Sequence, residues 1–171
     1  MVVVGNGVGA WISLLIASSS KEVGLIDGIV ALGADPDFTD DLLWDNLPVS
    51  EKEAIMRDGV ADIKWGNQVY PISKSLIEDG RKNFIMRGGR ASLDIGGVPV
   101  HLIHGLNDEE VPYSTSLRIA EIVKSDNVVV SVVKGAKHNL DREEDYSRMR
   151  AAVDGCFEDI VDYDLTSPGS G

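Results

Sequence analysis

The sequence predicts an α/β fold, a mostly parallel sheet with flanking helices. The first observation is alternation, because short runs rich in valine and isoleucine are separated by segments with the length and spacing of helices. The second is the start, where Met1 to Val4 is as apolar as a strand buried inside a parallel sheet. The third is composition: 171 residues, 43% of them hydrophobic and 26% charged, suffice for one globular domain with a sizeable core.

Charge and cysteine content exclude several classes of function. A formal net charge of -12 argues against a nucleic-acid partner, which needs a basic face. Cys156 is the only cysteine, so we expect no disulfide within the chain and no cysteine-based metal site. A single cysteine is also compatible with an intracellular compartment. The longest apolar run, Trp11 to Ala17, is too short to span a bilayer, which needs about 20 residues. We expect no cofactor.

The chain opens with a strand, a tight turn and a helix. The strand is followed by a glycine-dense turn, Gly5 to Gly9, and a helix is predicted over Val8 to Ser18. A strand this apolar needs neighbours on both sides, and nothing precedes it here. We therefore expect an N-terminally truncated domain, with an unpaired sheet edge at Met1 to Val4.

The turn itself has three interpretations. Gly5, Gly7 and Ala10 match the phosphate cradle G-x-G-x-x-G/A, but Asp27 precedes the next apolar run instead of ending it, as that site would require. Gly5 and Gly9 also frame a nucleophile elbow, G-x-S-x-G, with Gly7 in the place of the nucleophile. The third interpretation is a tight turn without chemistry.

A second buried strand is predicted over 24–33, and a segment of different character follows it, about 35–90. This segment has a helix-like stretch over 35–46, a capping box of Ser50 with Glu53 that opens a short helix to Asp58, a hairpin, and a helix over 72–84. The hairpin joins 59–65 to 68–72 through Gly66-Asn67. We expect the segment to be a small cover insertion over a substrate pocket.

The sheet pattern then returns. Strands are predicted over 97–104 and 127–133, and helices over 112–124 and 141–163, the last with Asp141 and Glu144 as a capping pair. The predicted domain is 1–165, and 166–171 is interpreted as a flexible tail.

Functional side chains in such a sheet lie in loops at the carboxyl ends of the strands. Three loops have that position: the glycine turn, the loop that contains Asp108, and the loop that contains His138. The chain order is thus nucleophile position, acid, histidine, which is the order found in α/β-hydrolases.

The motif His104-Gly-x-x-Asp108-x-x-Val111-Pro112, with His138 thirty residues after the acid, resembles the acid and histidine motifs of the α/β-hydrolases. Together with the elbow and Trp11, it is most similar to the branch of mitochondrial acyl-protein thioesterases and acyl-glucuronide esterases. The similarity covers nearly the whole chain, but only the second half of a complete domain of that family.

The resemblance implies roles for four residues. His138 would be the general base and then the acid, Asp108 would orient it, and the backbone N–H of Val8 would be one oxyanion donor. A second donor comes, in this family, from a loop before the elbow, which this chain does not contain. Gly7 lacks the side chain that a nucleophile needs.

The implied lineage activity is hydrolysis of acyl thioesters or carboxylic esters, and we expect this chain to be inactive or strongly impaired. The alternative is a non-catalytic pseudoenzyme that binds acyl ligands or a protein partner, or that self-associates through the exposed sheet edge. A mitochondrial location follows from the resemblance only.

Each candidate also has a structural interpretation. Asp108 could cap the helix near Pro112, and His138 could be an ordinary loop histidine. His104 and His138 with Asp108 could be imagined as metal ligands, but no helical or hairpin spacing supports a metal site. The remaining candidates are predicted to be structural or surface residues: Trp11, His101, His104, Glu109, Glu110 and Cys156.

Overall fold

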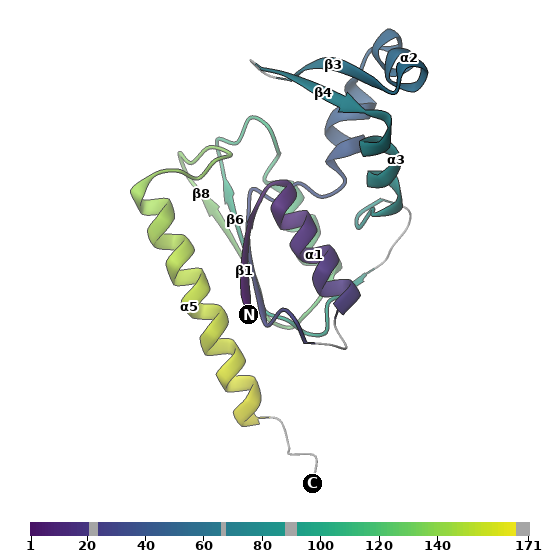
Figure 1. Cartoon of the computed structure of the whole chain (residues 1–171). Coiled ribbons are helices and arrows are strands. Elements are labelled where there is room, and N and C mark those ends of the chain that lie inside the picture. Colours follow the sequence, from purple (N-terminus) through teal and green to yellow (C-terminus); the bar gives the residue numbers. More distant parts are fainter. Residues whose placement is uncertain (21–23, 66–67, 88–91, 167–171) are drawn as a thin grey trace. The chain divides into compact units, whose positions relative to one another are not determined.

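The computed structural model describes residues 1–20, 24–65, 68–87 and 92–166 (Figure 1). Contacts divide the chain into two compact units, one formed by Met1–Pro36 with Gly88–Gly171 and the other by Asp37–Arg87. Each unit is described by itself below. The predicted tail over 166–171 lies outside the described residues except for Thr166, which ends the last helix.

The first unit contains the predicted parallel sheet. Its four strands have the order β1-β2-β6-β8, and every neighbouring pair is parallel. All residues of β2 are buried, as its continuous apolar run predicts. Within the described residues β1 has a strand neighbour on one side only. The strands are β1 Val2–Asn6, β2 Gly28–Leu32, β6 Val100–Gly105 and β8 Val128–Val133.

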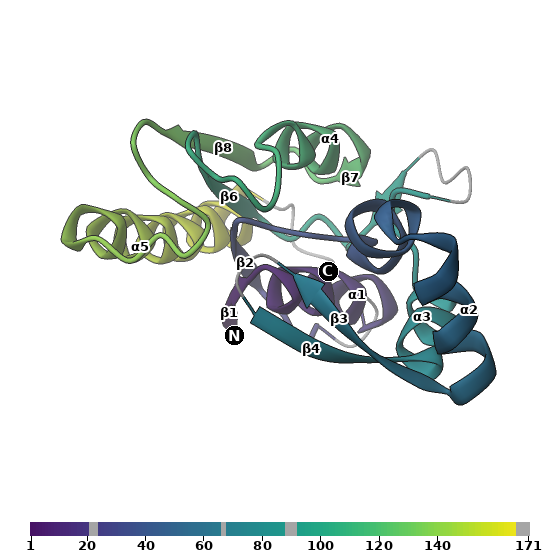
Figure 2. The ribbon, with the colours of Figure 1, turned by 90° about the horizontal axis from the view of Figure 1, so that it is seen from above.

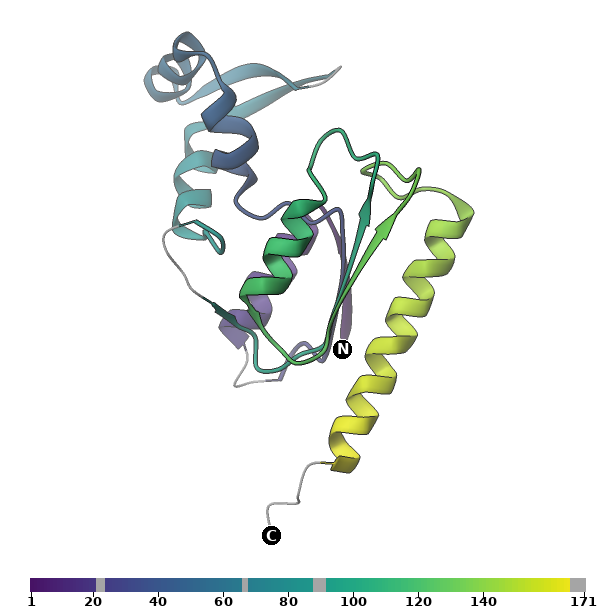
Figure 3. The same cartoon turned by 180° about the vertical axis from the view of Figure 1, so that it is seen from behind.

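Helices cover both faces of this sheet. Helix α1 (Val8–Ser20) and helix α4 (Ser114–Ile122) lie on one face, and the long helix α5 (Glu143–Thr166) lies on the other, as Figures 1, 2 and 3 agree. A short parallel pair that the sequence did not predict joins β5 (Leu93–Asp94) to β7 (Val123–Lys124). The predicted helix over 112–124 therefore ends two residues early, in a strand.

The core between the sheet and α5 depends on a close approach. Cys156 is fully buried there, as predicted, and burial raises the pKa of its thiol to about 11. A Cβ placed on Gly28 would lie 2.9 Å from the Cβ of Cys156, so only glycine lets α5 come this near to β2. Trp11 is also buried, as predicted.

The second unit, Asp37–Arg87, combines the predicted helices and hairpin around its own apolar core. Strands β3 and β4 are antiparallel, with Trp65 opposite Gln68, which confirms the predicted hairpin; its turn, 66–67, lies outside the described residues. The core consists of Leu43, Ile55, Ile63, Ile72 and Ile77. The elements are π-helix η1 Thr39–Leu43, 3₁₀ helix η2 Trp44–Asn46, α2 Val49–Asp58, β3 Val60–Trp65, β4 Gln68–Ser73 and α3 Lys74–Lys82. That this unit covers a substrate pocket stays a prediction.

Two predicted helix starts are wrong. Helix α2 begins at Val49 with Pro48 in the N-cap position and no side-chain cap, and Ser50 lies inside the helix, because the carbonyl of Pro48 already accepts the N–H groups of Glu51 and Lys52 at 3.1 Å each. At the start of α5, the N–H of Arg142 donates to the carboxylate of Asp145 at 3.2 Å, in place of the predicted pair of Asp141 with Glu144.

The two ends of the second unit are joined by one carboxylate. Asp37 is buried with φ 62°, and its two oxygens accept the backbone N–H groups of Ile85, Met86 and Arg87 at 2.8, 2.8 and 2.7 Å. Hydrogen bonds to a charged group contribute about 1.5–3 kcal/mol each. The carboxylate therefore holds the closing segment of the unit.

We expect Asp37→Gly, which suits the positive φ but removes the carboxylate, to destabilise the second unit by at least about 3 kcal/mol. Asp37→Asn keeps one acceptor oxygen and should lose less. Amide hydrogen exchange at 85–87 reports the effect. Equal, wild-type protection in both variants would contradict this assignment.

Candidate active site

Loops at the carboxyl ends of three parallel strands bring the predicted acid and histidine together. Asp108 follows β6 and His138 follows β8, and the distance from His138 Nδ1 to Asp108 Oδ2 is 2.9 Å. The glycine turn follows β1 at the same edge. The sequence prediction that these three loops meet agrees with this geometry.

Gly7 sits at the tip of the first loop, in a sharp strand-to-helix turn of the kind that a nucleophile elbow needs. Its φ is +53°, its N–H donates to the carbonyl of Leu32 at 2.9 Å, and α1 starts at the next residue. A Cβ placed on Gly7 would lie 3.5 Å from Nε2 of His138. A hydroxyl on such a Cβ could reach that nitrogen at a hydrogen-bond distance of about 2.8 Å.

The two outer glycines of the elbow differ. A Cβ on Gly5 would come within 2.5 Å of the backbone of Gly9, so Gly5 permits the tight return of the chain. A Cβ on Gly9 would meet nothing within 4 Å. The backbone N–H of Val8 belongs to the first turn of α1, where N–H groups have no acceptor within the helix, and this suits the predicted oxyanion donor.

Asp108 is held by four hydrogen bonds in a site where its side chain is 0% exposed. One oxygen, Oδ1, accepts the N–H groups of Glu110 and Val111 at 2.9 and 2.8 Å. Burial alone would raise the pKa of Asp108, but hydrogen bonds from His104, His138 and the two backbone amides hold it well below its usual range. The carboxylate is therefore ionised and can only accept.

It follows that Nδ1 of His138 carries the proton of the 2.9 Å bond and that Nε2 is the basic nitrogen. The hydrogen bond to Asp108 raises the pKa of His138; burial opposes this rise, and the charges of Asp108, Glu110 and Asp35 add to it. The raised pKa makes Nε2 a stronger base, and Nε2 is the atom of the His138 ring nearest to a Cβ on Gly7.

Two further glycines make room for the histidine loop, and the sequence analysis did not single them out. Gly33, at the end of β2, has φ +48°, and a Cβ there would lie 3.2 Å from Nδ1 of His138. A Cβ on Gly105 would lie 2.4 Å from the carbonyl oxygen of Ala136. The signal available in the sequence was their position directly after apolar strands.

We expect Gly105→Ala to lower the free energy of unfolding by about 1–3 kcal/mol or more, because backbone atoms of the histidine loop must move away. Gly9→Ala is the matched control, since open space surrounds that position and alanine favours a helix by about 0.5–1 kcal/mol. Urea denaturation of both variants measures the difference. Equal midpoints would contradict the close approach.

The remaining histidines differ from each other. His101 lies against α5, with Nε2 3.8 Å from Asp159, in agreement with its predicted structural role. His104 was predicted to be structural, but its Nε2 lies 3.2 Å from Oδ2 of Asp108. Among the residues that the structure describes, no group of three or more histidine, cysteine or acidic side chains could hold a metal ion.

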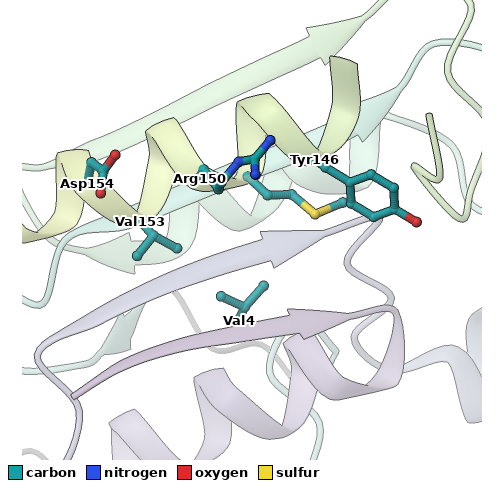
Figure 4. A pocket seen from close by; sticks show the side chains of 6 residues that line it. Val4, Tyr146, Arg150, Val153 and Asp154 are labelled. Atoms are coloured by element: carbon teal, nitrogen blue, oxygen red, sulfur yellow. The ribbon is translucent and has the colours of Figure 1, made fainter. Parts of the chain in front are cut away.

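A groove of about 550 Å³ lies apart from these residues, between β1 and α5 (Figure 4). Val4 contributes from the strand, and Tyr146, Met149, Arg150, Val153 and Asp154 contribute from the helix. It borders the strand edge that the sequence predicts to be exposed.

None of the described helices is both long and apolar enough to cross a membrane.

The fold and the site define the class. A parallel sheet covered on both faces, with a glycine turn into a helix after β1, a buried acid after β6 and a histidine after β8, is the arrangement of an α/β-hydrolase, and the chain belongs to the α/β-hydrolase superfamily. This confirms the predicted fold class and favours the elbow over the phosphate cradle.

Particular relatives agree with this class. The chain is 28% identical, over 166 residues, to mitochondrial palmitoyl-protein thioesterase ABHD10 from Homo sapiens and from Bos taurus, covering 94% of this chain and 50% of each relative. It thus spans about half the length of the curated relatives it matches. No family model matches the chain.

Solved structures have the same fold. A candidate hydrolase from Agrobacterium vitis S4 superposes with a TM-score of 0.81 at 31% identity, covering 91% of this chain and 60% of that one. Alpha/beta hydrolase domain-containing protein 10 from mouse has a TM-score of 0.76 at 20% identity, with 93% and 62% covered.

Proposed function

We propose that the chain carries the acid–base half of an acyl hydrolase, with lineage activity toward acyl thioesters or carboxylic esters. The observation that carries the proposal is the His138–Asp108 pair, whose basic nitrogen faces the tip of an elbow 3.5 Å from the position of a Cβ on Gly7. The relatives that it matches are thioesterases by name, which favours a thioester as substrate.

The proposed chemistry needs a nucleophile that this chain lacks. In a complete site a hydroxyl at position 7 attacks the acyl carbon, Nε2 of His138 takes its proton, and Asp108 stabilises the imidazolium that results. The N–H of Val8 stabilises the oxyanion, and His138 returns the proton to the leaving thiolate or alkoxide. A water molecule, deprotonated by the same nitrogen, then attacks the acyl group bound to the hydroxyl and releases it as the carboxylic acid. Because Gly7 stands in the place of the nucleophile, we propose that the hydrolytic activity of the chain is strongly impaired.

A mitochondrial location is part of the proposal, because the matched relatives are mitochondrial by name.

The experiment compares a palmitoyl thioester with the matching oxygen ester as substrates of the purified Gly7→Ser variant. We expect turnover of both, with higher kcat/KM for the thioester. Turnover of neither would overturn the proposal that the site is a preorganised acyl hydrolase.

A second candidate function is binding without catalysis. It is favoured by the groove beside β1 and by the edge of that strand, where Val4 is 49% exposed. Binding of a palmitoyl ligand or self-association by the natural chain, together with an inactive Gly7→Ser variant, would support this candidate over the hydrolase.

A further inference from the structure

Two buried polar side chains, His104 and Ser116, continue the hydrogen-bonded series from His138 and Asp108. Ser116 Oγ, on α4, is 2.7 Å from Nδ1 of His104, and Nε2 of His104 is 3.2 Å from Oδ2 of Asp108. The side chains of His104 and Asp108 are both 0% exposed, and Ser116 is buried as well. Buried polar groups of this kind depend on one another for their hydrogen bonds.

The partners of His104 fix the direction of each hydrogen bond. Its Nε2 faces two groups that can only accept, the carbonyl oxygen of Val111 at 3.0 Å and the carboxylate of Asp108. Nε2 must therefore carry a hydrogen and donate it. In the neutral ring, Nδ1 then accepts the hydroxyl hydrogen of Ser116, which selects this tautomer.

Nε2 of His104 contacts the same oxygen, Oδ2 of Asp108, that binds Nδ1 of His138. Oδ2 of Asp108 accepts from Nδ1 of His138 at 2.9 Å and also lies 3.2 Å from Nε2 of His104, which shares its one hydrogen between Oδ2 and the carbonyl oxygen of Val111 at 3.0 Å. Oδ1 is occupied by two backbone N–H groups. Without His104 the carboxylate would keep its place through Oδ1, but Oδ2 would carry more negative charge toward His138.

We propose that His104, locked by Ser116, is a positioning residue that sets how strongly Asp108 holds a proton on His138. The inference rests on the proposed function only in treating His138 as the base. His104 is fully buried, and among the described residues beyond its chain neighbours a Cβ on Gly7 would meet only His138 within 4 Å. His104 acts on the reaction through Asp108, by taking part of the hydrogen-bonding capacity of Oδ2.

The chain has three histidines, so the titration of each ring can be followed by NMR in the intact protein. In His104→Leu we expect the pKa of His138 to rise by up to about one pH unit, because a donor to the carboxylate is lost. In His104→Gln, whose amide N–H can replace the Nε2 donor, the pKa should stay near that of the natural chain. The other acidic groups that face His138, Asp35 and Glu110, are unchanged in both variants.

Ser116→Ala tests the same series of hydrogen bonds but keeps the imidazole ring of His104. It provides the test if His104→Leu does not fold. Loss of the hydroxyl donor makes Nε2–H a weaker donor, so a smaller rise in the pKa of His138 is expected. The positioning role would be overturned if the pKa of His138 were the same in His104→Leu, in His104→Gln and in the unsubstituted protein. The same pKa in Ser116→Ala and in the unsubstituted protein would overturn it as well.

Activity distinguishes this inference from the proposed function. The titration needs no turnover. If Gly7→Ser is inactive but His104→Leu still changes the pKa of His138, only the proposed function is refuted. In an active Gly7→Ser background, His104→Leu should lower kcat at neutral pH with little change in KM, because it raises the pH at which the base becomes neutral. An active background with an unchanged pH profile overturns the positioning role alone.

Discussion

Replacing Gly7 with serine is expected to raise ester turnover by a factor on the order of 10⁴ or more. Removing the nucleophile of a triad costs about 10⁶ in kcat, because its members act as a unit, and restoring it should recover a large part of that factor. The geometry supports the gain, since a Cβ at this position would be 3.5 Å from the basic nitrogen of His138. Hydrolysis of a short-chain activated ester by both proteins, side by side, measures it.

Gly7→Ala is the matched control for this prediction. Alanine adds the same Cβ at the same φ of +53°, with the same approach to His138, but brings no hydroxyl. Both substitutions should cost about 1 kcal/mol of stability, because non-glycine residues are strained at positive φ. If alanine and serine gave equal turnover, a nucleophile at position 7 would not be the cause.

The pH dependence of the Gly7→Ser variant follows from the same pair. His138 must be neutral to act as a base, and its hydrogen bond to Asp108 raises its pKa above the ordinary 6.5. Turnover should therefore fall as the pH drops through this raised value, with half of the maximum above pH 6.5. The stability that the same bond contributes has the opposite sign: it is present below pH 6.5 and is lost as the pH rises through the pKa of folded His138.

The sequence could predict the sheet and the loops of the site because both depend on local signals. Valine-rich runs mark the strands, and in a parallel sheet the loops after them meet at one edge, so Asp108 and His138 could be placed together. The same reasoning could not find Asp37, whose carboxylate closes a segment 48 to 50 residues away. No local pattern distinguishes such an aspartate from one at the surface.

His104 shows the same limit inside the site. Its motif position suggested a structural residue, and its burial agrees with that. Its contact with Oδ2 of Asp108 depends on how the loop after β6 folds back over the strand end, and its tautomer depends on Ser116 in the next helix. The capping box at Ser50 failed for the opposite reason, because a local pattern was present and Pro48 had already started the helix.

In the Gly7→Ser background, Asp108→Asn should lower kcat by a factor on the order of 10⁴. The two backbone N–H groups at 110 and 111 would keep the amide oxygen of asparagine in the place of Oδ1, which turns its NH₂ group toward the histidines. That group donates, and so does Nδ1–H of His138. His138 would therefore change tautomer, place its hydrogen on Nε2, and lose the lone pair that faces position 7.

Glu109→Gln is the control, because it removes a neighbouring charge from an exposed side chain outside the four hydrogen bonds of Asp108. It should leave kcat within about twofold, as expected for a surface charge. The decisive reading is the pH profile: Asp108→Asn should also remove the rise in the pKa of His138, since its first cause is the bond to that carboxylate. Turnover of Asp108→Asn within tenfold of its parent would mean that the histidine does not depend on this acid, and the pair would then be structural.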